Sequence, residues 1–228
     1  MIFFKKPTSN ETLFGFLYYA LQLLIIPAIL VLVAMMLPVP RSEAEINFVY
    51  FALNFVAVLL IFRKFLIANF RTVIAYPWYT LRCAGLGFLI YMAGNFVFSL
   101  VVTMLAPDFA NVNNAAIQVM VQDHFTLMTI GVVFLVPLAE ECFYRALIFR
   151  NLYNKSPFLA YSISMIAFSL SHVLGYVGTE DFGTLFLCFV QYLPAAFALA
   201  WCYRRSGSIF APILIHMVVN QTGMLMMR

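Results

Sequence analysis

Long apolar stretches, broken by short polar segments, constrain this 228-residue chain more than any other feature. Hydrophobic residues make up 64% of the sequence and charged residues only 10%. A soluble domain has about a quarter of its residues charged, because charged side chains cover its surface in water. A chain this poor in charge has to face lipid, so we predict an integral membrane protein.

Seven stretches are candidates for membrane spans. A hydrocarbon core about 30 Å thick needs roughly 20 apolar residues in a helix. The candidate spans are residues 13–37, 47–62, 83–105, 125–149, 157–177, 183–203 and 208–226. No connecting segment is long enough to fold by itself. We therefore predict an all-α fold, a polytopic membrane helix bundle with about seven transmembrane helices, which forms a single domain over residues 1–228.

The basic residues lie mostly on one side of these spans. Lys and Arg are concentrated in the cytoplasmic segments of membrane proteins. With the N-terminus in the cytoplasm, ten basic residues fall on the cytoplasmic side and two, Arg41 and Arg228, on the outer side. We therefore predict a cytoplasmic N-terminus. The bases are scattered singly between helices, which indicates membrane topology rather than nucleic-acid binding. Residues 63–82 mix bases with aromatic residues and are expected to lie along the inner membrane interface.

Three charged residues lie deep within a predicted span, namely Glu140, Glu141 and Arg145. Each costs roughly 2.5–3.5 kcal/mol at the centre of a membrane helix. Glu141 and Arg145 are four residues apart, so they share a helix face and can form an ion pair, which could serve structure alone. Glu140 points about 100° away from Glu141, lacks that partner and is expected to be functional. Pro137 removes a backbone donor and is expected to kink the helix.

Two later spans carry further polar residues, His172 in one and His216 with Asn220 in the other. A lone histidine in a membrane often only joins helices. Here, however, three separate helices each send a polar group into the membrane. A carboxylate with an imidazole suits activation of water, and an imidazole with a carboxamide suits stabilisation of an oxyanion. The sequence has no HExxH or GxSxG motif, although a metal site built from Glu140, His172 and His216 is chemically possible.

These residues fall into three motifs in order along the chain. Residues 140–145 (EECFYR) fit EExxxR, residues 168–172 (FSLSH) fit FxxxH, and residues 216–220 (HMVVN) fit HxxxN. The chain thereby resembles the CAAX-protease and bacteriocin-processing family (CPBP, or Abi) of intramembrane glutamate proteases. The resemblance is strongest over residues 133–220.

The resemblance implies an intramembrane endopeptidase that uses neither a metal nor a cofactor. Glu140 and His172 would activate the attacking water, and His216 and Asn220 would stabilise the oxyanion. Glu141 and Arg145 would support the geometry of the site. The implied partners are membrane lipid and a peptide or lipidated-protein substrate, with no nucleic acid.

Two other functions fit some of these features. A non-catalytic membrane immunity or scaffold protein, acting in bacteriocin self-protection, would keep the motifs as structural polar contacts. A transporter would use Glu140 to relay protons, but it should also show internal repeats, and we find none. The short loops favour a minimal bacterial enzyme acting on a peptide precursor, so we expect the bacterial cytoplasmic membrane. The sequence does not indicate an oligomeric state.

Overall fold

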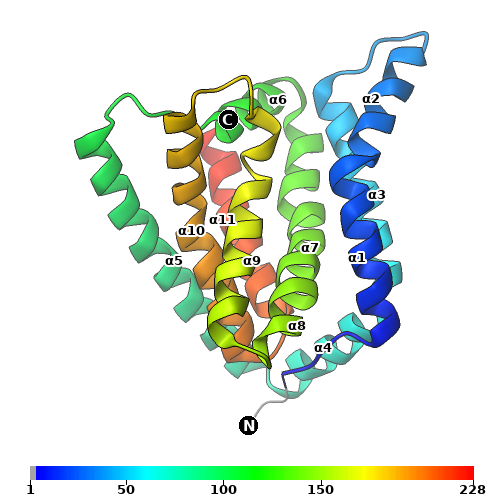
Figure 1. Ribbon diagram of the computed structural model, residues 1–228, viewed down its shortest axis with the longest axis vertical. Coiled ribbons are helices and arrows are strands. Elements are labelled where there is room, and N and C mark those ends of the chain that lie inside the picture. Colours follow the sequence, from blue (N-terminus) through cyan, green and yellow to red (C-terminus); the bar gives the residue numbers. More distant parts are fainter. Residues whose placement is uncertain (1–3) are drawn as a thin grey trace.

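The computed structural model describes residues 4–228, and every regular element in this part of the chain is a helix (Figure 1). The order is α1 (Ser9–Leu24), α2 (Ile26–Met36), α3 (Glu43–Ile61), α4 (Arg63–Ala75), α5 (Pro77–Leu105), α6 (Val112–Thr129), η1 (Ile130–Leu135), α7 (Val136–Glu141), η2 (Cys142–Phe149), α8 (Arg150–Tyr153), α9 (Pro157–Ser171), η3 (Leu174–Tyr176), α10 (Phe182–Ser206) and α11 (Phe210–Met226). Here η1 and η2 are π-helices and η3 is a 3₁₀-helix. The predicted all-α fold is confirmed.

Side chains define where α1 and α3 begin. Thr8 and Glu11 form a capping box at the start of α1, and Ser42 and Glu45 form another at the start of α3. Each box satisfies backbone N–H groups that have no partner inside the helix. Glu11 also accepts a hydrogen bond from the backbone N–H of Phe65 at 2.8 Å, so the same carboxylate that caps α1 holds α4 against it.

The seven predicted spans all coincide with helices, but four helical stretches are long and apolar enough by themselves to cross a membrane. These are α3, α5, α10 and the continuous run from Val112 to Tyr153. A fifth is formed if α1 and α2, which meet at a bend of 46°, are counted together. The remaining two helices, α9 and α11, have 15 and 17 residues. Integral membrane character is supported, whereas the count of seven spans is not confirmed.

One predicted boundary coincides with a kink, and one predicted helix is divided. Helix α6 begins at Val112, capped by Asn111, but His124 has non-helical backbone angles (φ −139°, ψ 56°) and breaks it. The span predicted to start at residue 125 therefore begins directly after this kink. Residues 63–82 do not form one interfacial helix: α4 ends at Ala75, and Pro77 begins the long helix α5.

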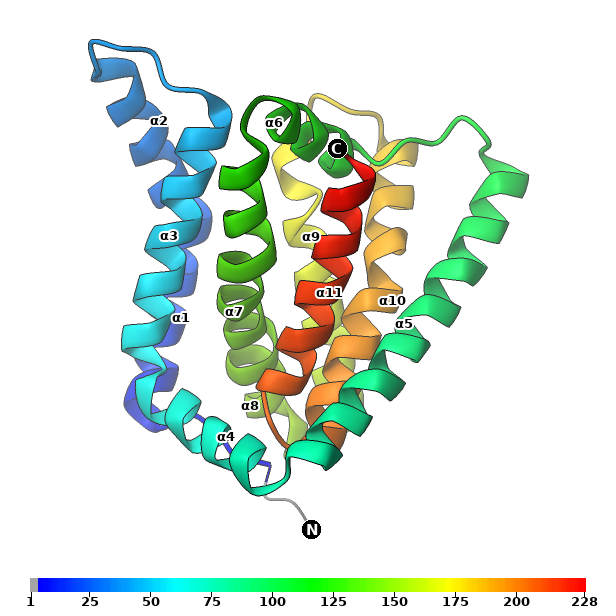
Figure 2. The ribbon, with the colours of Figure 1, turned by 180° about the vertical axis from the view of Figure 1, so that it is seen from behind.

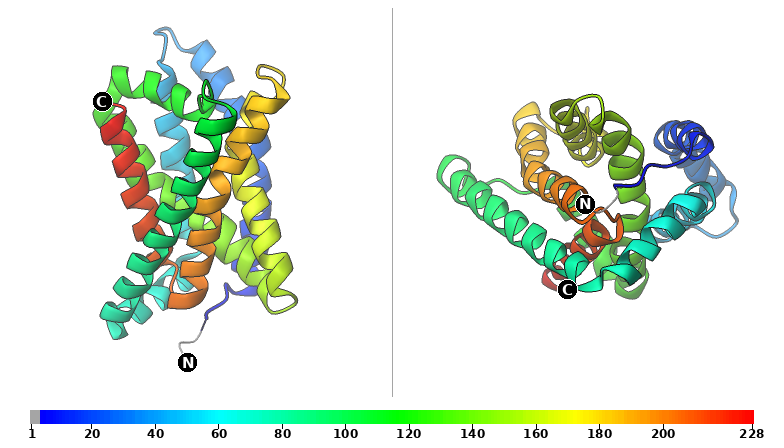
Figure 3. Two further views of the ribbon diagram at one scale, coloured as in Figure 1. Left: turned by 90° about the vertical axis from the view of Figure 1, so that its left-hand side faces the viewer. Right: turned by 90° about the horizontal axis from the view of Figure 1, so that it is seen from below.

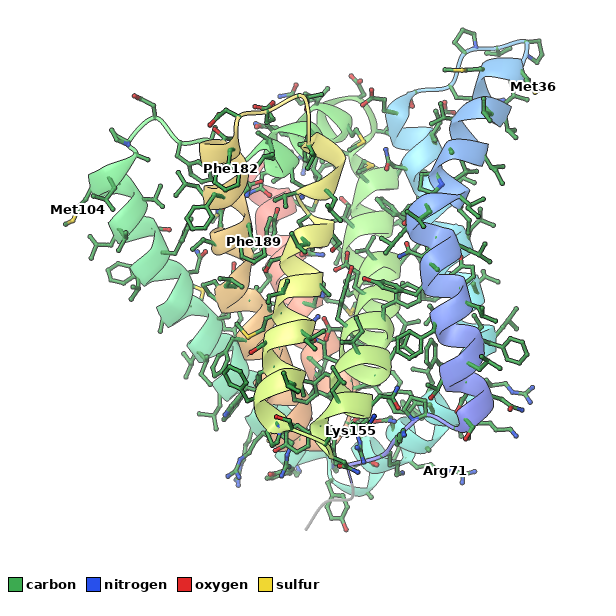
Figure 4. All side chains as sticks on the ribbon, viewed as in Figure 1. Met36, Arg71, Met104, Lys155, Phe182 and Phe189 are labelled. Atoms are coloured by element: carbon green, nitrogen blue, oxygen red, sulfur yellow. The ribbon has the colours of Figure 1, made fainter. Side chains whose placement is uncertain are left out.

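The helices with the three motifs form the middle of the bundle. The run η1–α7–η2 packs beside α9 and α11, with α1 to α3 on one side and α5 on the other (Figures 1 and 2). At the end of the bundle near the N-terminus, α4 crosses from α3 to α5 (Figure 3). Lys155 and Arg71 lie at this same end, and Met36, Met104 and Phe182 lie at the other (Figure 4). The basic residues Lys155 and Arg71, which the sequence assigns to the same side of the membrane, therefore lie at the same end of the bundle.

The positions of the basic residues predict which end of the bundle faces the cytoplasm. Single cysteines replacing Lys155 or Arg205 in a cysteine-free variant should react with an impermeant thiol reagent only in inside-out vesicles. Cysteines replacing Glu180 or Met227 should react in intact cells. Labelling of all four variants after membrane disruption serves as the control for accessibility. The reverse pattern at both pairs would contradict a cytoplasmic N-terminus.

Candidate active site

A buried chain of charged groups links η2 to α11. The Glu141 and Arg145 side chains are fully buried, with 3.2 Å between Glu141 Oε2 and Arg145 Nε. The ion pair expected from their four-residue spacing is therefore present. The other Glu141 oxygen, Oε1, lies 3.0 Å from His216 Nδ1. Glu141 thus uses its two oxygens separately, one for the arginine of its own helix run and one for the histidine of α11.

Aromatic and backbone groups complete the surroundings of Arg145. Its guanidinium carbon lies 4.5 Å from the centre of the Phe168 ring, and Nη2 donates to the Ala196 carbonyl at 3.3 Å. A cation over an aromatic face is stabilised by the ring quadrupole, more so where water is excluded. Phe168 is the first residue of the FxxxH motif, so this contact joins the first two motifs.

Glu140 has a different environment from its neighbour. Its Oε2 atom is buried, and none of the described residues 4–228 forms a hydrogen bond with it. The nearest cationic or imidazole nitrogen is His216 Nε2 at 3.7 Å, which is longer than a hydrogen bond. Glu140 is therefore a partly exposed carboxylate, with 23% of its side chain accessible, and only its Oε2 atom is buried.

The end of α9 fixes the orientation of His172. Its Nδ1 atom lies 2.8 Å from the Phe168 carbonyl oxygen, which can only accept a hydrogen bond. Nδ1 therefore carries the proton, and in the neutral ring Nε2 is an acceptor. The ring also stacks on Tyr192, with centroids 4.1 Å apart. His172 is thus held as a base with a defined acceptor atom.

Pro137 explains the position of Asn220. In η1 the N–H of Val136 donates five residues back, to the Gly131 carbonyl. The next donor in this π-helical register would be residue 137, but proline has no N–H, so the Val132 carbonyl lacks its backbone donor. Asn220 Nδ2 donates to this carbonyl at 2.8 Å. The asparagine of the third motif thereby ties α11 to the helix run that carries the two glutamates.

The four residues predicted to be catalytic line one cavity of about 530 Å³, namely Glu140, His172, His216 and Asn220. Helices α1, α3, α6, α7, α9, α10 and α11 contribute to its wall. Glu141 and Arg145 do not line it, in keeping with the supporting position expected for them. A second cavity, of about 320 Å³, lies between α5, α10 and α11 and shares His172, His216 and Asn220 with the first. Among residues 4–228, no group of three His, Cys, Asp or Glu side chains is arranged to hold a metal ion.

The larger cavity also has a polar wall that the sequence analysis did not identify. Glu43, Asn47, Tyr50 and Asn54 of α3 all line it. Their spacing of four, three and four residues places them on one face of the helix. This spacing is the signal that the sequence carries for the polar wall; the predicted start of the span at residue 47 left out only Glu43.

Comparison with known families agrees with this geometry. Residues 122–222, somewhat less than half of the chain, match the sequence model of the family described as type II CAAX prenyl endopeptidase Rce1-like. The matched segment contains all three motifs, so the match bears out the resemblance to the CAAX-protease family that these motifs indicated. No curated protein and no solved structure matches the chain.

The burial of the Glu141–Arg145 pair predicts a large effect on stability. Glu141→Gln leaves the arginine charge uncompensated, and breaking such a pair costs about 3–5 kcal/mol. The midpoint of thermal unfolding in detergent should fall strongly. Arg41 and Glu45 form a matched control, because they have the same spacing, a distance of 3.5 Å and exposed side chains. Glu45→Gln should cost less than about 1 kcal/mol. Equal effects of the two substitutions would contradict the structural importance of the buried pair.

The hydrogen bond from Asn220 to the Val132 carbonyl predicts that substitutions of Asn220 and Pro137 have coupled effects on stability. Asn220→Ala removes the donor of this partly buried carbonyl, which should cost about 1 kcal/mol of stability, as for loss of a typical hydrogen bond. Pro137→Ala supplies a new backbone N–H, so Asn220→Ala should cost less stability in that background. A double-mutant cycle of unfolding midpoints measures the coupling. Additive effects would show that Val132 does not depend on Asn220.

Proposed function

We propose that this protein is a metal-independent intramembrane glutamate endopeptidase in which Glu140 and His172 activate water. The observation that carries the proposal is the common cavity of the four motif residues, in which Glu140 Oε2 has no hydrogen-bond partner among the described residues. A carboxylate and an imidazole acceptor that line one cavity suit general-base catalysis. The family match supports an intramembrane CAAX-type endopeptidase in general.

In the proposed reaction, water donates one hydrogen bond to Glu140 and the other to His172 Nε2. Glu140 takes a proton as the water oxygen attacks the carbonyl carbon of the scissile peptide. The proton then passes to the leaving amine, and the peptide C–N bond breaks. Each step uses only water, the peptide and side chains of this chain, so no redox partner is needed.

The oxyanion formed in this reaction would be stabilised by His216 and Asn220. His216 Nδ1 faces Glu141, so Nε2 can donate to the oxyanion only when the ring is an imidazolium. Asn220 uses one N–H of its amide on Val132 and has a second N–H for the oxyanion. Donors of this kind act best where they are already oriented before the reaction.

The formal charges of the site balance under this assignment. Glu140 and Glu141 are negative, while Arg145 and His216 are positive. A neutral cluster is far less costly inside a membrane than a charged one.

We further propose a peptide or lipidated-protein substrate in the bacterial cytoplasmic membrane. The second cavity is lined largely by apolar side chains, including Phe88, Met92 and Leu199, and suits an apolar part of the substrate. The larger cavity extends to Glu43 and Asn113, at the beginnings of α3 and α6. In Figure 2 these helix ends lie at the end of the bundle away from the N-terminus.

Replacement of the base tests the proposed mechanism. Glu140→Gln keeps the size and hydrogen-bonding capacity of the side chain but removes the base, so turnover of a fluorogenic CAAX peptide should fall at least about 10²-fold. The unfolding midpoint in detergent should stay near that of the unmodified protein. Glu180→Gln, at an exposed residue outside the cavity, is the matched control and should not change turnover.

Two outcomes would contradict this mechanism. Near-normal turnover by Glu140→Gln would exclude it as the base. Loss of turnover after exhaustive chelation, restored by zinc, would make Glu140, His172 and His216 metal ligands. If Glu140→Gln protects cells from a bacteriocin as well as the unmodified protein does, a non-catalytic immunity role gains support instead.

A further inference from the structure

Asn54 has an unused hydrogen-bond acceptor in the larger cavity. The residue is buried on α3, with 5% of its surface exposed, and it lines the cavity that contains Glu140. Its Nδ2 donates to the Tyr50 carbonyl at 3.0 Å, one turn back in the same helix. Its Oδ1 is buried and has no hydrogen-bond partner among residues 4–228. A buried polar atom without a partner is costly and needs an explanation.

A second asparagine of this chain shows what such an acceptor can bind. Asn69 of α4 is also buried, and its Nδ2 donates to the Phe65 carbonyl at 2.9 Å, again one turn back. Its Oδ1 accepts the backbone N–H of Ile209 at 3.0 Å. The two asparagines therefore have the same local geometry, but only Asn69 has a backbone N–H as a partner. Asn54 itself lines the cavity, and no other helix of the described residues supplies a donor to its Oδ1.

The length of the polar wall matches a short peptide. Glu43, Asn47, Tyr50 and Asn54 line the cavity over a stretch of α3 from residue 43 to residue 54, which is about 16 Å long at a rise of 1.5 Å per residue. An extended peptide advances about 3.3 Å per residue, so about five residues would lie along this wall. The wall begins with the exposed Glu43 at the start of α3 and ends with Asn54 deep in the bundle.

Tyr50 is held in place and does not compete for the Asn54 acceptor. Its hydroxyl donates to the Gln22 side chain of α1, and Gln22 is itself buried. The hydroxyl also lies 3.2 Å from the Gln22 carbonyl oxygen. Because this donor is already used, the Tyr50 hydroxyl is not the partner of Asn54 Oδ1.

We propose that Asn54 is a substrate-binding residue, whose Oδ1 accepts a hydrogen bond from a main-chain N–H of an extended peptide lying along α3. This inference rests on the proposed peptidase function and specifies how that site holds its substrate. Binding through the backbone would position the peptide whatever its side chains are, while the motif residues act on the scissile bond.

Backbone N-methylation of a peptide tests this contact without requiring turnover. The probe is a fluorescein-labelled octapeptide, farnesylated at the cysteine of a C-terminal CAAX sequence, with a single N-methyl group placed at each backbone nitrogen in turn. Its Kd is measured by fluorescence anisotropy on the full-length Glu140→Gln protein. One N-methyl position should weaken binding about three- to tenfold, as expected for loss of one neutral hydrogen bond. Adding Asn54→Ala should weaken binding of the unmethylated peptide by a similar factor and remove the penalty at that position.

Asn69→Ala is the matched control, because it removes a buried asparagine whose amide is fully paired within the protein. It should leave the N-methyl penalty unchanged. Asn54→Leu, which fills the space with an apolar side chain, repeats the test should Asn54→Ala fold poorly. The proposal would be overturned if the N-methyl penalty at that position persisted in both Asn54 variants. It would also be overturned if the peptide showed no saturable binding. If the binding test fails but Glu140→Gln still abolishes turnover, the proposal for Asn54 is wrong and the proposed peptidase mechanism stands. The two proposals can therefore be judged separately.

Discussion

The buried contact between Glu141 and Arg145 is the interaction on which the rest of the site depends. It lets two adjacent carboxylates lie inside a membrane helix bundle, because one of them is neutralised within its own helix run. The same glutamate then orients His216, and the same arginine lies against Phe168. Three helices are thus held in register by one charged pair. Glu140, the neighbour outside this arrangement, stays available to the cavity.

A second constraint comes from the backbone. Pro137 lacks a backbone N–H close to the two glutamates. The preceding turn is π-helical, and the amide of Asn220 donates to the Val132 carbonyl in place of a backbone N–H. The asparagine therefore has a structural contact that is independent of any reaction. Its position relative to Glu140 is set by a main-chain carbonyl of the same helix run, which is more rigid than a contact between two side chains. Catalytic geometry of this kind requires that groups keep their positions within fractions of an ångström.

The local parts of this arrangement could be predicted from the sequence, and the parts that depend on tertiary structure could not. The Glu141–Arg145 pair followed from spacing, since a helix brings residues four apart together without help from other elements. The hydrogen bond from Asn220 to the Val132 carbonyl depends on a π-helical turn, and the pattern of apolar residues does not predict such a turn. The span predicted to reach residue 177 ends early, because Ser171 and His172 both bond the Phe168 carbonyl and close α9. Asn54 was missed because its significance lies in an atom that has no partner, and only coordinates reveal that.

The direction in which the larger cavity extends bears on when the proposed cleavage would occur relative to export of the substrate. Its wall reaches the start of α3, at the end of the bundle away from Lys155 and Arg71. With the N-terminus in the cytoplasm, a newly made peptide would meet this cavity only after its cleavage segment had crossed the membrane. Processing would then follow export and could not precede it. The orientation of the bundle would keep the precursor intact inside the cell, and no separate inhibitor would be needed for that purpose.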